Sequence, residues 1–336
     1  MSRQNLSSYH PKFDSLTLYE SFSEEVLILS NGPVHLQVPK IDIRTRGGST
    51  QDATPPAVWF KKDVEEYLTR AKAICAANEA NLRRSYLPAP YQPCILESEA
   101  DIVRSAALWL LHPVIIALQS QFEKQQVGCH AEVTIDDCRC DALIKIDGEV
   151  MVVLEYKNRG HIKPAEFAAG RVRDFSTANR GAIVDTINTI VGTKQESAMA
   201  NNAKCLTKQA AAYASKFGTR FVALFDWDNL FLWHFAGKDF RKGRPSKLPH
   251  TALDGHARWA YGTPVESRKH YRKALLGFIM EAYSEKKNAK FEQPQVAPFE
   301  PTRAELQRAR AQAEAKRLAD MTAQQRANAN MYRRGD

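Results

Sequence analysis

The sequence has few cysteines and no long apolar run. Six cysteines in 336 residues are sparse, so we expect free thiols in a reducing intracellular compartment, with nucleus and cytoplasm not distinguished. No apolar stretch opens the chain, so we expect no secretory signal. No run reaches the ~18 apolar residues of a membrane span, because His112 and Pro113 interrupt the longest one, residues 106–118. We expect this run to be a buried helix and the protein to have no membrane contact.

The composition is that of a folded protein with a basic surface. Hydrophobic residues make up 44% of the chain and charged residues 25%, which excludes wholesale disorder and allows one domain of roughly 200–250 residues with extensions. The formal net charge is +9 and the pI is about 9.2. Surface lysines and arginines attract phosphates, so this charge favours a polyanion such as nucleic acid as the partner.

Hydrophobic periodicity and turn residues divide the chain into four parts. We expect an N-terminal extension (1–94), a core (95–236), a basic loop and helix packing on the core (237–286), and a linker with a polar C-terminal helix (287–336). Helices are predicted at 57–87, 97–121, 203–217, 265–283 and 302–328, and strands at 34–38, 131–135, 142–146, 150–154, 221–225 and 230–235. Ser98 is the expected N-cap of the second helix, and Asp147-Gly148 the expected turn of a hairpin. The fold class is therefore α/β.

Three charged residues gather at one end of that hairpin. Side chains alternate along a strand, so Glu155 and Lys157 project from the same face, after the wholly apolar run 151–154. A simple register through the Asp147-Gly148 turn brings Asp141 close to residue 154 or 155. Isolated buried charges are unfavourable, so these groups need one another, a metal or an ionic ligand.

This combination suits the hydrolysis of a phosphodiester. Mg²⁺ prefers oxygen ligands, often one or two carboxylates, with water and phosphate oxygens completing the octahedron. A bound metal lowers the pKa of its water, and a nearby lysine holds that water or stabilises the phosphate. We predict that Asp141 and Glu155 bind Mg²⁺ (or Mn²⁺) beside Lys157. Glu99 continues the apolar stripe of the helix 97–121, so it should face the sheet as a third acid.

The order of these residues resembles a known signature. Glu99, Asp141, Glu155-Tyr156-Lys157 and Gln209-Ala-Ala-Ala-Tyr213, the last followed by a strand pair, resemble the PD-(D/E)XK pattern of the restriction-endonuclease-like nuclease superfamily over residues 95–236. The resemblance implies a mixed sheet of about five strands flanked by helices. It also implies a metal held by Asp141, Glu155, Glu99 and the Tyr156 backbone carbonyl, with Lys157 positioning water and Gln209 orienting the site. Two features depart from the pattern: Cys140 stands where the family has Pro, and the segment between Lys157 and Gln209 is long.

Simpler interpretations remain open for several of these residues. A Glu and a Lys at strand spacing are typical of a solvated edge, and an acid in the first turn of a helix, such as Glu99, favours the helix dipole without any further role. Gln209 has the alternative of a plain helix position, and Tyr213 is expected in the core. A cluster of possible zinc ligands lacks the paired CxxC spacing of structural zinc sites, so buried thiols are expected; its members are Cys129, His130, Cys138 and Cys140.

Basic residues follow the predicted sheet. They are expected to form a positive patch that contacts the substrate backbone: Lys238, Arg241, Lys242, Arg244 and Lys247. Residues 241–247 (RKGRPSK) also resemble an AT-hook, which lies in the minor groove of A·T-rich DNA, although a basic surface loop explains them equally well. The helix 302–328 lacks a heptad of large apolar residues, so it is expected to be solvated, with a protein partner as the alternative.

The expected function is a Mg²⁺-dependent endonuclease that acts on DNA in preference to RNA. Cutting both strands of a duplex would favour a homodimer. One alternative is a nucleic-acid-binding module that keeps the fold but does not cut, and another is a protein-interaction factor that acts through its C-terminal helix. Fold alone does not choose the biological role.

Overall fold

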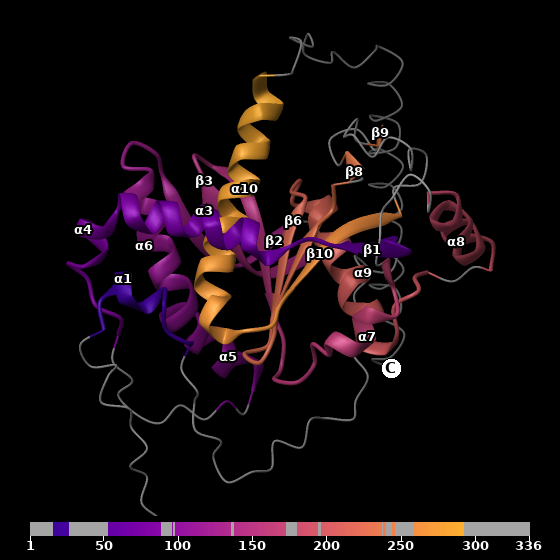
Figure 1. The fold of residues 1–336 in the computed structure, drawn as a ribbon, viewed down its shortest axis with the longest axis horizontal. Coiled ribbons are helices and arrows are strands. Elements are labelled where there is room, and N and C mark those ends of the chain that lie inside the picture. The colour runs from indigo at the N-terminus through magenta and orange to yellow at the C-terminus, as the bar shows by residue number, and fades with distance from the viewer. Residues whose placement is uncertain are drawn as a thin grey trace, which may run out of the picture. The chain divides into compact units, whose positions relative to one another are not determined.

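The computed structural model describes the backbone of residues 16–26, 53–88, 96, 98–135, 138–172, 180–193, 196–236, 238–239, 244–245 and 258–291. Figure 1 shows these segments as coloured ribbons. Residues 1–286 form one compact unit and residues 287–336 form another. Of the second unit, only the end of the helix that reaches Phe291 is described. The predicted strand 34–38 and the predicted helix 302–328 lie outside the described residues.

A mixed sheet of eight strands organises the first unit. Its spatial order is β2-β3-β4-β6-β7-β10-β1-β5, with bounds β1 Val58–Lys61, β2 Val127–Ile135, β3 Cys138–Ile146, β4 Glu149–Tyr156, β5 Arg171–Val172, β6 Phe221–Phe225, β7 Leu230–His234 and β10 Trp259–Val265. The pairs β4–β6, β10–β1 and β1–β5 are parallel and the others antiparallel. A separate two-stranded sheet joins β8 Lys238–Asp239 to β9 Arg244–Pro245. The predicted α/β class is confirmed, and the sheet is wider than the predicted five strands.

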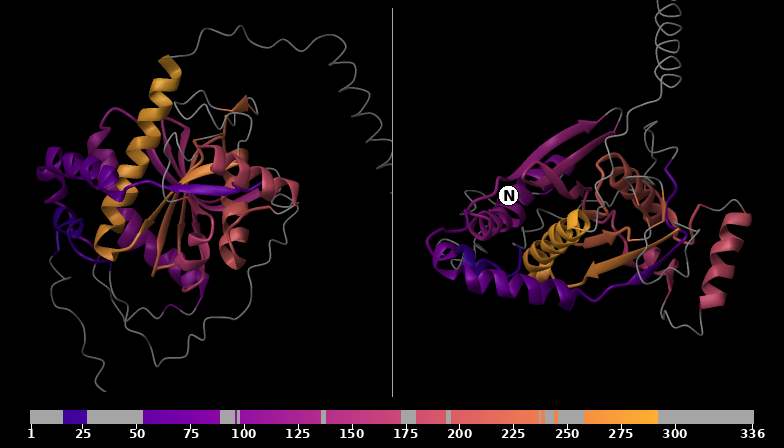
Figure 2. Two further views of the ribbon diagram at one scale, coloured as in Figure 1. Left: turned by 45° about the vertical axis from the view of Figure 1, so that its right-hand side comes forward. Right: turned by 90° about the horizontal axis from the view of Figure 1, so that it is seen from above.

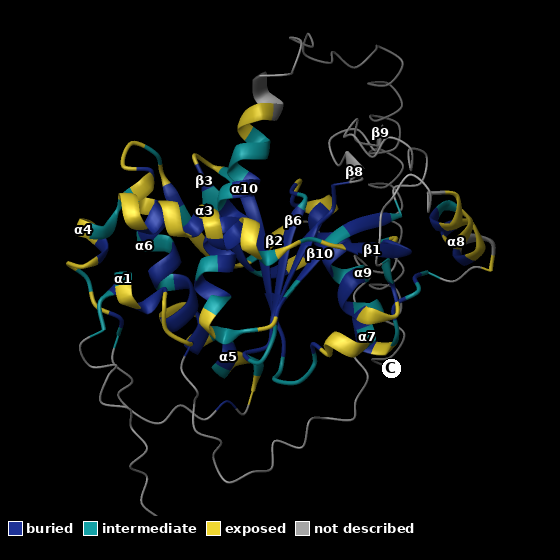
Figure 3. Cartoon of the chain, viewed as in Figure 1, coloured by how far each residue is buried: buried dark blue, intermediate teal, exposed yellow. Residues whose placement is uncertain are grey.

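Helices cover both faces of the large sheet (Figures 1 and 2). One face packs against α3 Val64–Ala77, α5 Glu99–Ala106, the π-helical turn η2 Ala107–Leu111, α6 His112–Gln121 and α10 Tyr271–Phe291, with the short helices α1 Leu18–Ser21 and α4 Glu79–Leu82 beside them. The other face packs against α7 Pro164–Ala168 and α9 Asn201–Lys216. A smaller apolar cluster joins α8 Arg180–Gly192 to β1. The central strands are therefore buried on both faces, as Figure 3 shows.

Local signals account for several element ends. Ser98 caps α5 through a reciprocal capping box with Asp101, as the sequence predicts, because its hydroxyl accepts from an N–H that the helix leaves unpaired. Asp147 and Gly148 have φ values of 51° and 77°, the left-handed pair that a tight hairpin turn requires. Gly218, with φ of 63°, follows the end of α9.

Pro113 explains both the π-helical turn and a long-range contact. Proline has no N–H, so Pro113 cannot donate to the carbonyl of Trp109 in the helical ladder, and the π-helical turn Ala107–Leu111 lies immediately before α6. The buried guanidinium of Arg272 in α10 donates to that carbonyl instead, at 2.6 Å, and to the Ser21 carbonyl at 2.7 Å. Arg272 thus ties three separate segments together.

Two predictions from the sequence are wrong. The predicted helix 57–87 begins with the strand β1, and the part predicted as a basic loop and helix, residues 237–286, contains the strand β10. Both strands are buried and rich in aromatic residues. The periodicity of a short apolar run does not distinguish a buried strand from a helix. The parallel pairing of β1 with β10 also joins residues far apart in the sequence, such as Val58 and Trp259.

Among the described helices, one stretch, Glu99–Gln121, is long and apolar enough to cross a membrane, judged by length and composition alone. In this structure 56% of its most apolar window is buried inside the protein, against the sheet and α10. Residues 106–118, predicted as a buried helix, lie within it.

We expect Gly277→Ala to destabilise the fold strongly. A Cβ atom at position 277 of α10 would lie 2.0 Å from the Tyr67 carbonyl oxygen of α3, so the two helices would have to separate. Overpacking of this kind lowers the free energy of unfolding by roughly 1–3 kcal/mol or more, measurable by urea unfolding. The control is Gly181→Ala in α8, where a new Cβ meets nothing within 4 Å. Equal stability of the two variants would contradict the close helix contact.

Candidate active site

The predicted acids meet on adjacent strands. The register of β3 with β4 pairs Ala142 with Leu154, and one step further places Asp141 beside Glu155. The Tyr156 N–H donates to Asp141 Oδ2 at 2.7 Å, which fixes the Asp141 carboxylate at the end of β4. The structure therefore brings together the two carboxylates that the sequence placed at residues 141 and 155.

Glu155 is a buried carboxylate with one oxygen bonded and one left over. It is 2% exposed, and its Oε1 accepts from Lys157 Nζ at 2.5 Å and from Gln209 Nε2 at 2.7 Å. Its Oε2 has no hydrogen-bond partner among the residues that the structure describes. Burial raises the pKa of Glu155 to about 8, and repulsion from Asp141 adds to this while Lys157 opposes it. Such a group is stabilised by a further cation.

Lys157 connects the acids of two different elements. Its ammonium pairs with Glu155 and lies 3.9 Å from Glu99 Oε2. Burial alone would lower the pKa of Lys157, but attraction to Glu155 and Glu99 outweighs burial and raises it. Lys157 therefore stays protonated, as a buried positive charge held at the site.

Glu99 reaches the site from the first turn of α5. Its side chain is 41% exposed, and partial burial raises its pKa while Lys157 opposes the shift. It faces the sheet as its place on the apolar stripe predicts. Among the described residues, Glu99 forms an ion pair with Lys157. No such contact joins it to the carboxylates of Asp141 and Glu155.

Gln209 and Tyr213 approach from α9. Gln209 Nε2 donates to Glu155 Oε1 and, at 2.6 Å, to the Tyr213 hydroxyl. Tyr213, expected in the core, is buried, and its hydroxyl reaches the polar site. Because these residues lie one helical turn apart, α9 holds the Glu155 carboxylate from above the sheet.

The carboxylate oxygens of the site suit a magnesium ion, although the protein side chains alone do not complete its coordination sphere. Among the residues that the structure describes, no three His, Cys, Asp or Glu side chains come together as metal ligands. Mg²⁺ usually takes only one or two carboxylates from a protein and fills its remaining positions with water and phosphate oxygens. Asp141 and Glu155, with the unpartnered Oε2 of Glu155, match that demand. The Tyr156 carbonyl stays a predicted ligand.

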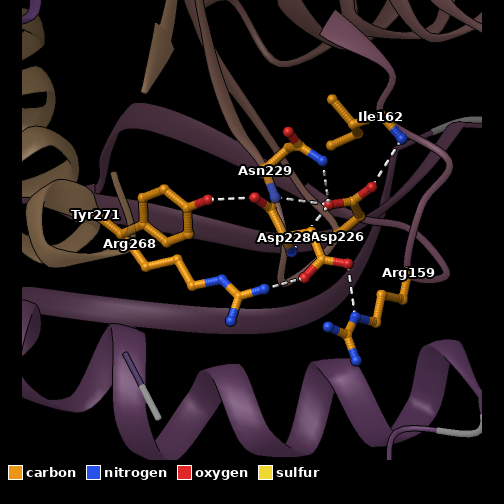
Figure 4. A network of polar contacts seen from close by, with 7 residues as sticks. All are labelled: Arg159, Ile162, Asp226, Asp228, Asn229, Arg268 and Tyr271. Atoms are coloured by element: carbon orange, nitrogen blue, oxygen red, sulfur yellow. Dashed lines mark hydrogen bonds and ion pairs between the residues drawn. The ribbon is translucent and has the colours of Figure 1, made fainter. Parts of the chain in front are cut away.

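The segment after Lys157 is held by residues that the sequence did not single out (Figure 4). The buried Asp226 carboxylate accepts from the backbone N–H groups of Ile162 and Asn229, each at 2.8 Å, and from that of Asp228 at 3.2 Å. Burial raises the pKa of Asp226 to about 7, and these donors oppose the shift. Asp226 thereby holds the chain five residues beyond Lys157.

A second carboxylate anchors the same segment. Asp228 accepts from Arg159 Nε at 2.6 Å and also pairs with Arg268, while the Tyr271 hydroxyl donates to the Asp228 carbonyl at 2.5 Å. Figure 4 shows Asp228 between the two guanidinium groups. The turn 226–229 between β6 and β7 therefore also fixes the position of the segment that follows β4.

His161 is a further polar group near the site. Its Nε2 is buried without a hydrogen-bond partner, and burial together with Lys157 and Lys163 lowers its pKa. No motif points to His161, because its place depends on the turn in which its N–H donates to the Asn158 carbonyl at 3.1 Å and Gly160 adopts a φ of 80°.

The cysteine cluster is not a zinc site in the described residues. Cys138 and Cys140 are buried, as predicted, whereas Cys129 is exposed, so the prediction of a buried thiol is wrong there. Cys129 and His130 lie on β2, which pairs with β3 alone. Burial raises the pKa of Cys140 to about 12, which keeps this thiol protonated and a poor metal ligand.

The predicted positive patch is outside what the structure describes. Arg241, Lys242 and Lys247 lie outside the described residues, and only the backbone of Lys238 and Arg244 is described, in β8 and β9. The AT-hook-like residues 241–247 therefore stay a prediction.

We expect Glu155 to make the protein less stable at higher pH when no divalent metal is present. Its pKa of about 8 in the folded protein lies above its ordinary value of 4.5. A raised pKa contributes stability at low pH that is lost as the pH rises through the folded value. The free energy of unfolding of the wild type should therefore fall relative to Glu155→Gln between about pH 4.5 and 8, measured by urea unfolding in EDTA. Parallel curves for the two proteins would contradict the assignment.

We expect Asp226→Asn to destabilise the segment after β4. The amide would place an N–H₂ group against one of the backbone donors that Asp226 now accepts, leaving that donor buried and unpaired. The free energy of unfolding should fall by roughly 1–3 kcal/mol, measured by urea unfolding. Asp185→Asn removes the same charge from an exposed position of α8 and should change the free energy by less than about 0.5 kcal/mol. A similarly small effect at Asp226 would show that its hydrogen bonds do not hold the segment.

Comparison with known proteins leaves the family open. No family model, no curated protein and no solved structure matches the chain. The likeness to restriction-endonuclease-like nucleases therefore rests on the residues and geometry described above, and membership of that superfamily stays a prediction.

Proposed function

We propose that the protein is a metal-dependent nuclease that hydrolyses phosphodiester bonds, with DNA favoured over RNA. One observation carries the proposal. The adjacent carboxyl groups of Asp141 and Glu155 leave a buried oxygen with no partner among the described residues, and Lys157 is held beside them. A structural ion pair would need no second acid and no unpartnered oxygen. Two carboxyl groups beside a lysine suit a site that receives a cation and a phosphate.

The finer fold is part of the proposal. The five strands β2, β3, β4, β6 and β7 are consecutive in the sheet, with α5 and α9 carrying Glu99 and Gln209 to the end of β4. That order of elements and polar residues is similar to a restriction-endonuclease-like core. In this proposal β10, β1 and β5 are additions to one edge of the core.

Asp141 and Glu155 would hold Mg²⁺ or Mn²⁺, and the Tyr156 carbonyl would add a third oxygen. When bound, the ion lowers the pKa of coordinated water and neutralises charge that develops on the phosphate. The backbone N–H of Tyr156 orients Asp141, and Gln209 orients Glu155. Both carboxylates are thus held in place in the ligand-free protein, which reduces the reorganisation that binding requires.

Lys157 provides the positive charge for the scissile phosphate. Its protonated ammonium donates to Glu155 and has further N–H groups for a water or a phosphate oxygen. Burial strengthens such an interaction because little water screens it. Glu99 Oε2 lies 3.9 Å from Lys157 Nζ. This contact keeps the ammonium near the N-terminus of α5 and reduces its freedom to leave the site.

We expect the purified protein to cut plasmid or linear DNA in Mg²⁺ or Mn²⁺ and to be inactive in EDTA. Asp141→Asn and Lys157→Ala should each reduce the cutting rate at least about 100-fold, because each removes a group that stabilises charge in the transition state. Single-stranded DNA and RNA substrates, run in parallel on gels, compare the nucleic acids directly.

Matched variants control for charge and for folding. Lys145→Ala removes a lysine from the other end of β3, and Asp185→Asn removes an exposed acid of α8; both should cut as the wild type does. Cutting that survives Asp141→Asn would rule out the site. Binding of nucleic acid without cutting in either metal would identify a binding module on the same fold.

A further inference from the structure

A cavity opens at the same edge of the sheet as the candidate site. It has a volume of about 280 Å³ and lies between α7 and the ends of β7 and β10. Its lining includes the buried Trp59, Phe231 and Ile162, together with the exposed Ala165 and Ala168 of α7. The volume is close to the lower end of the ~300–1,000 Å³ range of small-molecule sites, so a single ring system fits and a base pair does not.

The strand register places this cavity in line with Glu155. Glu155 pairs with Leu224, Leu224 with Phe231, and Phe231 with Pro264. Paired residues on neighbouring strands project from the same face, so Glu155 and the cavity residues Phe231 and Pro264 form one row across the sheet. Adjacent strands are about 4.8 Å apart, so Phe231 lies about 10 Å from Glu155 along that row. Ile162, whose backbone N–H donates to Asp226, also lines the cavity.

The edge of the cavity carries a positive charge. Arg171 lines the cavity and is half-buried, and its backbone pairs with that of Trp59 in the sheet. Glu266, the acid that also lines it, has its charge offset by Lys61 at 3.7 Å and is largely exposed. An anion therefore meets a guanidinium there.

We infer that the cavity holds one unstacked base of the nucleic-acid substrate while Arg171 contacts the adjacent phosphate; this rests on the proposed nuclease function. The apolar lining suits the faces and edges of a base, and the Trp59 Nε1–H already donates to the Phe167 carbonyl at 2.8 Å. The indole N–H of Trp59 is thus not available to a ligand, so the cavity accepts different nucleobases alike. Two β-strand spacings, about 10 Å, separate the cavity residue Phe231 from Glu155. The bound base would therefore lie a short way along the nucleic acid from the phosphate at Lys157.

An abasic scan tests the inference on the full-length protein. Single-stranded oligonucleotides, each lacking one base at a defined distance from the cut, are tested for cleavage in Mg²⁺. Their binding is measured by fluorescence anisotropy in EDTA. We expect one position, within a few nucleotides of the cut, to weaken both binding and cleavage about tenfold, since a held base contributes about a factor of ten or more to binding. The other positions should have little effect.

Filling the cavity gives the matched variants. Ala168→Trp places a large side chain in the cavity lining, and Ala169→Trp makes the same change at the next exposed position, which does not line the cavity. Ala168→Trp should weaken binding of the intact oligonucleotide about tenfold and abolish the position dependence of the scan, while Ala169→Trp behaves as the wild type. Arg171→Ala should reduce the salt dependence of binding by about one counterion, and Arg171→Lys should restore it.

The outcomes separate this inference from the proposed function. The base site is overturned, and the nuclease function is not, if the wild type cuts DNA but removing a base has the same effect at every position. In that case Ala168→Trp and Ala169→Trp would also bind the oligonucleotide equally well. A wild type that neither binds nor cuts nucleic acid overturns both. Weakening by Ala168→Trp together with a position-dependent scan supports the base site.

Discussion

The buried carboxylate of Glu155 is the group on which the arrangement of the site depends. A charge with almost no exposure to water is unfavourable unless other groups compensate for it. Lys157 and Gln209 compensate through one oxygen, and the second oxygen has no hydrogen-bond partner among the described residues. The carboxylate is therefore only partly compensated, and a cation beside its second oxygen would compensate it further. That property distinguishes it from a surface ion pair, in which water solvates both partners.

The site is rigid because three layers of structure fix its members. The ladder between β3 and β4 sets Asp141 beside Glu155, and the Lys157 N–H donates to the Phe225 carbonyl at 2.9 Å, so β6 sets the direction of the chain after β4. The turn at Asp226 then holds that chain through Ile162. The hydrogen bond of Asp226 to Ile162 involves neither Lys157 nor Glu155, so a side chain away from the acids contributes to their geometry.

Sequence reasoning works here where the cause is local. The Ser98 cap, the Asp147-Gly148 turn and the apolar strand that ends at Glu155 follow from a few neighbouring residues, and the structure shows each of them. The meeting of Asp141 with Glu155 follows only in part. The Asp147-Gly148 turn alone would pair Asp141 with residue 154, and the register shift between Ile144 and Lys145 moves the pairing by one residue, which places Asp141 beside Glu155. The sequence therefore predicts that these acids lie close together, but it does not predict the shift that sets them side by side.

Long-range pairing accounts for what the sequence does not predict. β1 lies beside β10 and β5 through contacts that no local pattern encodes, so the sequence predicts a helix at β1 and a sheet of only five strands. Arg159 and Asp228 meet only because the turn after β6 lies next to the segment after β4. His161 likewise has no motif, since its position depends on that segment being held.

The strands beyond β7 have a consequence for the site. β10 extends the row that runs from Glu155 through Phe231 of β7, and Pro264 on β10 lines the cavity with Phe231. Trp59, on β1, also lines the cavity, and its ring meets that of Phe231 edge-on with centroids 5.4 Å apart. A core of five strands ending at β7 would lack these residues of β10 and β1. The strands that the sequence does not predict thus complete a recess whose Phe231, on the predicted strand β7, lies about 10 Å from Glu155 by the spacing of two strands. A substrate strand lying along this edge of the sheet would reach both the acids and the recess.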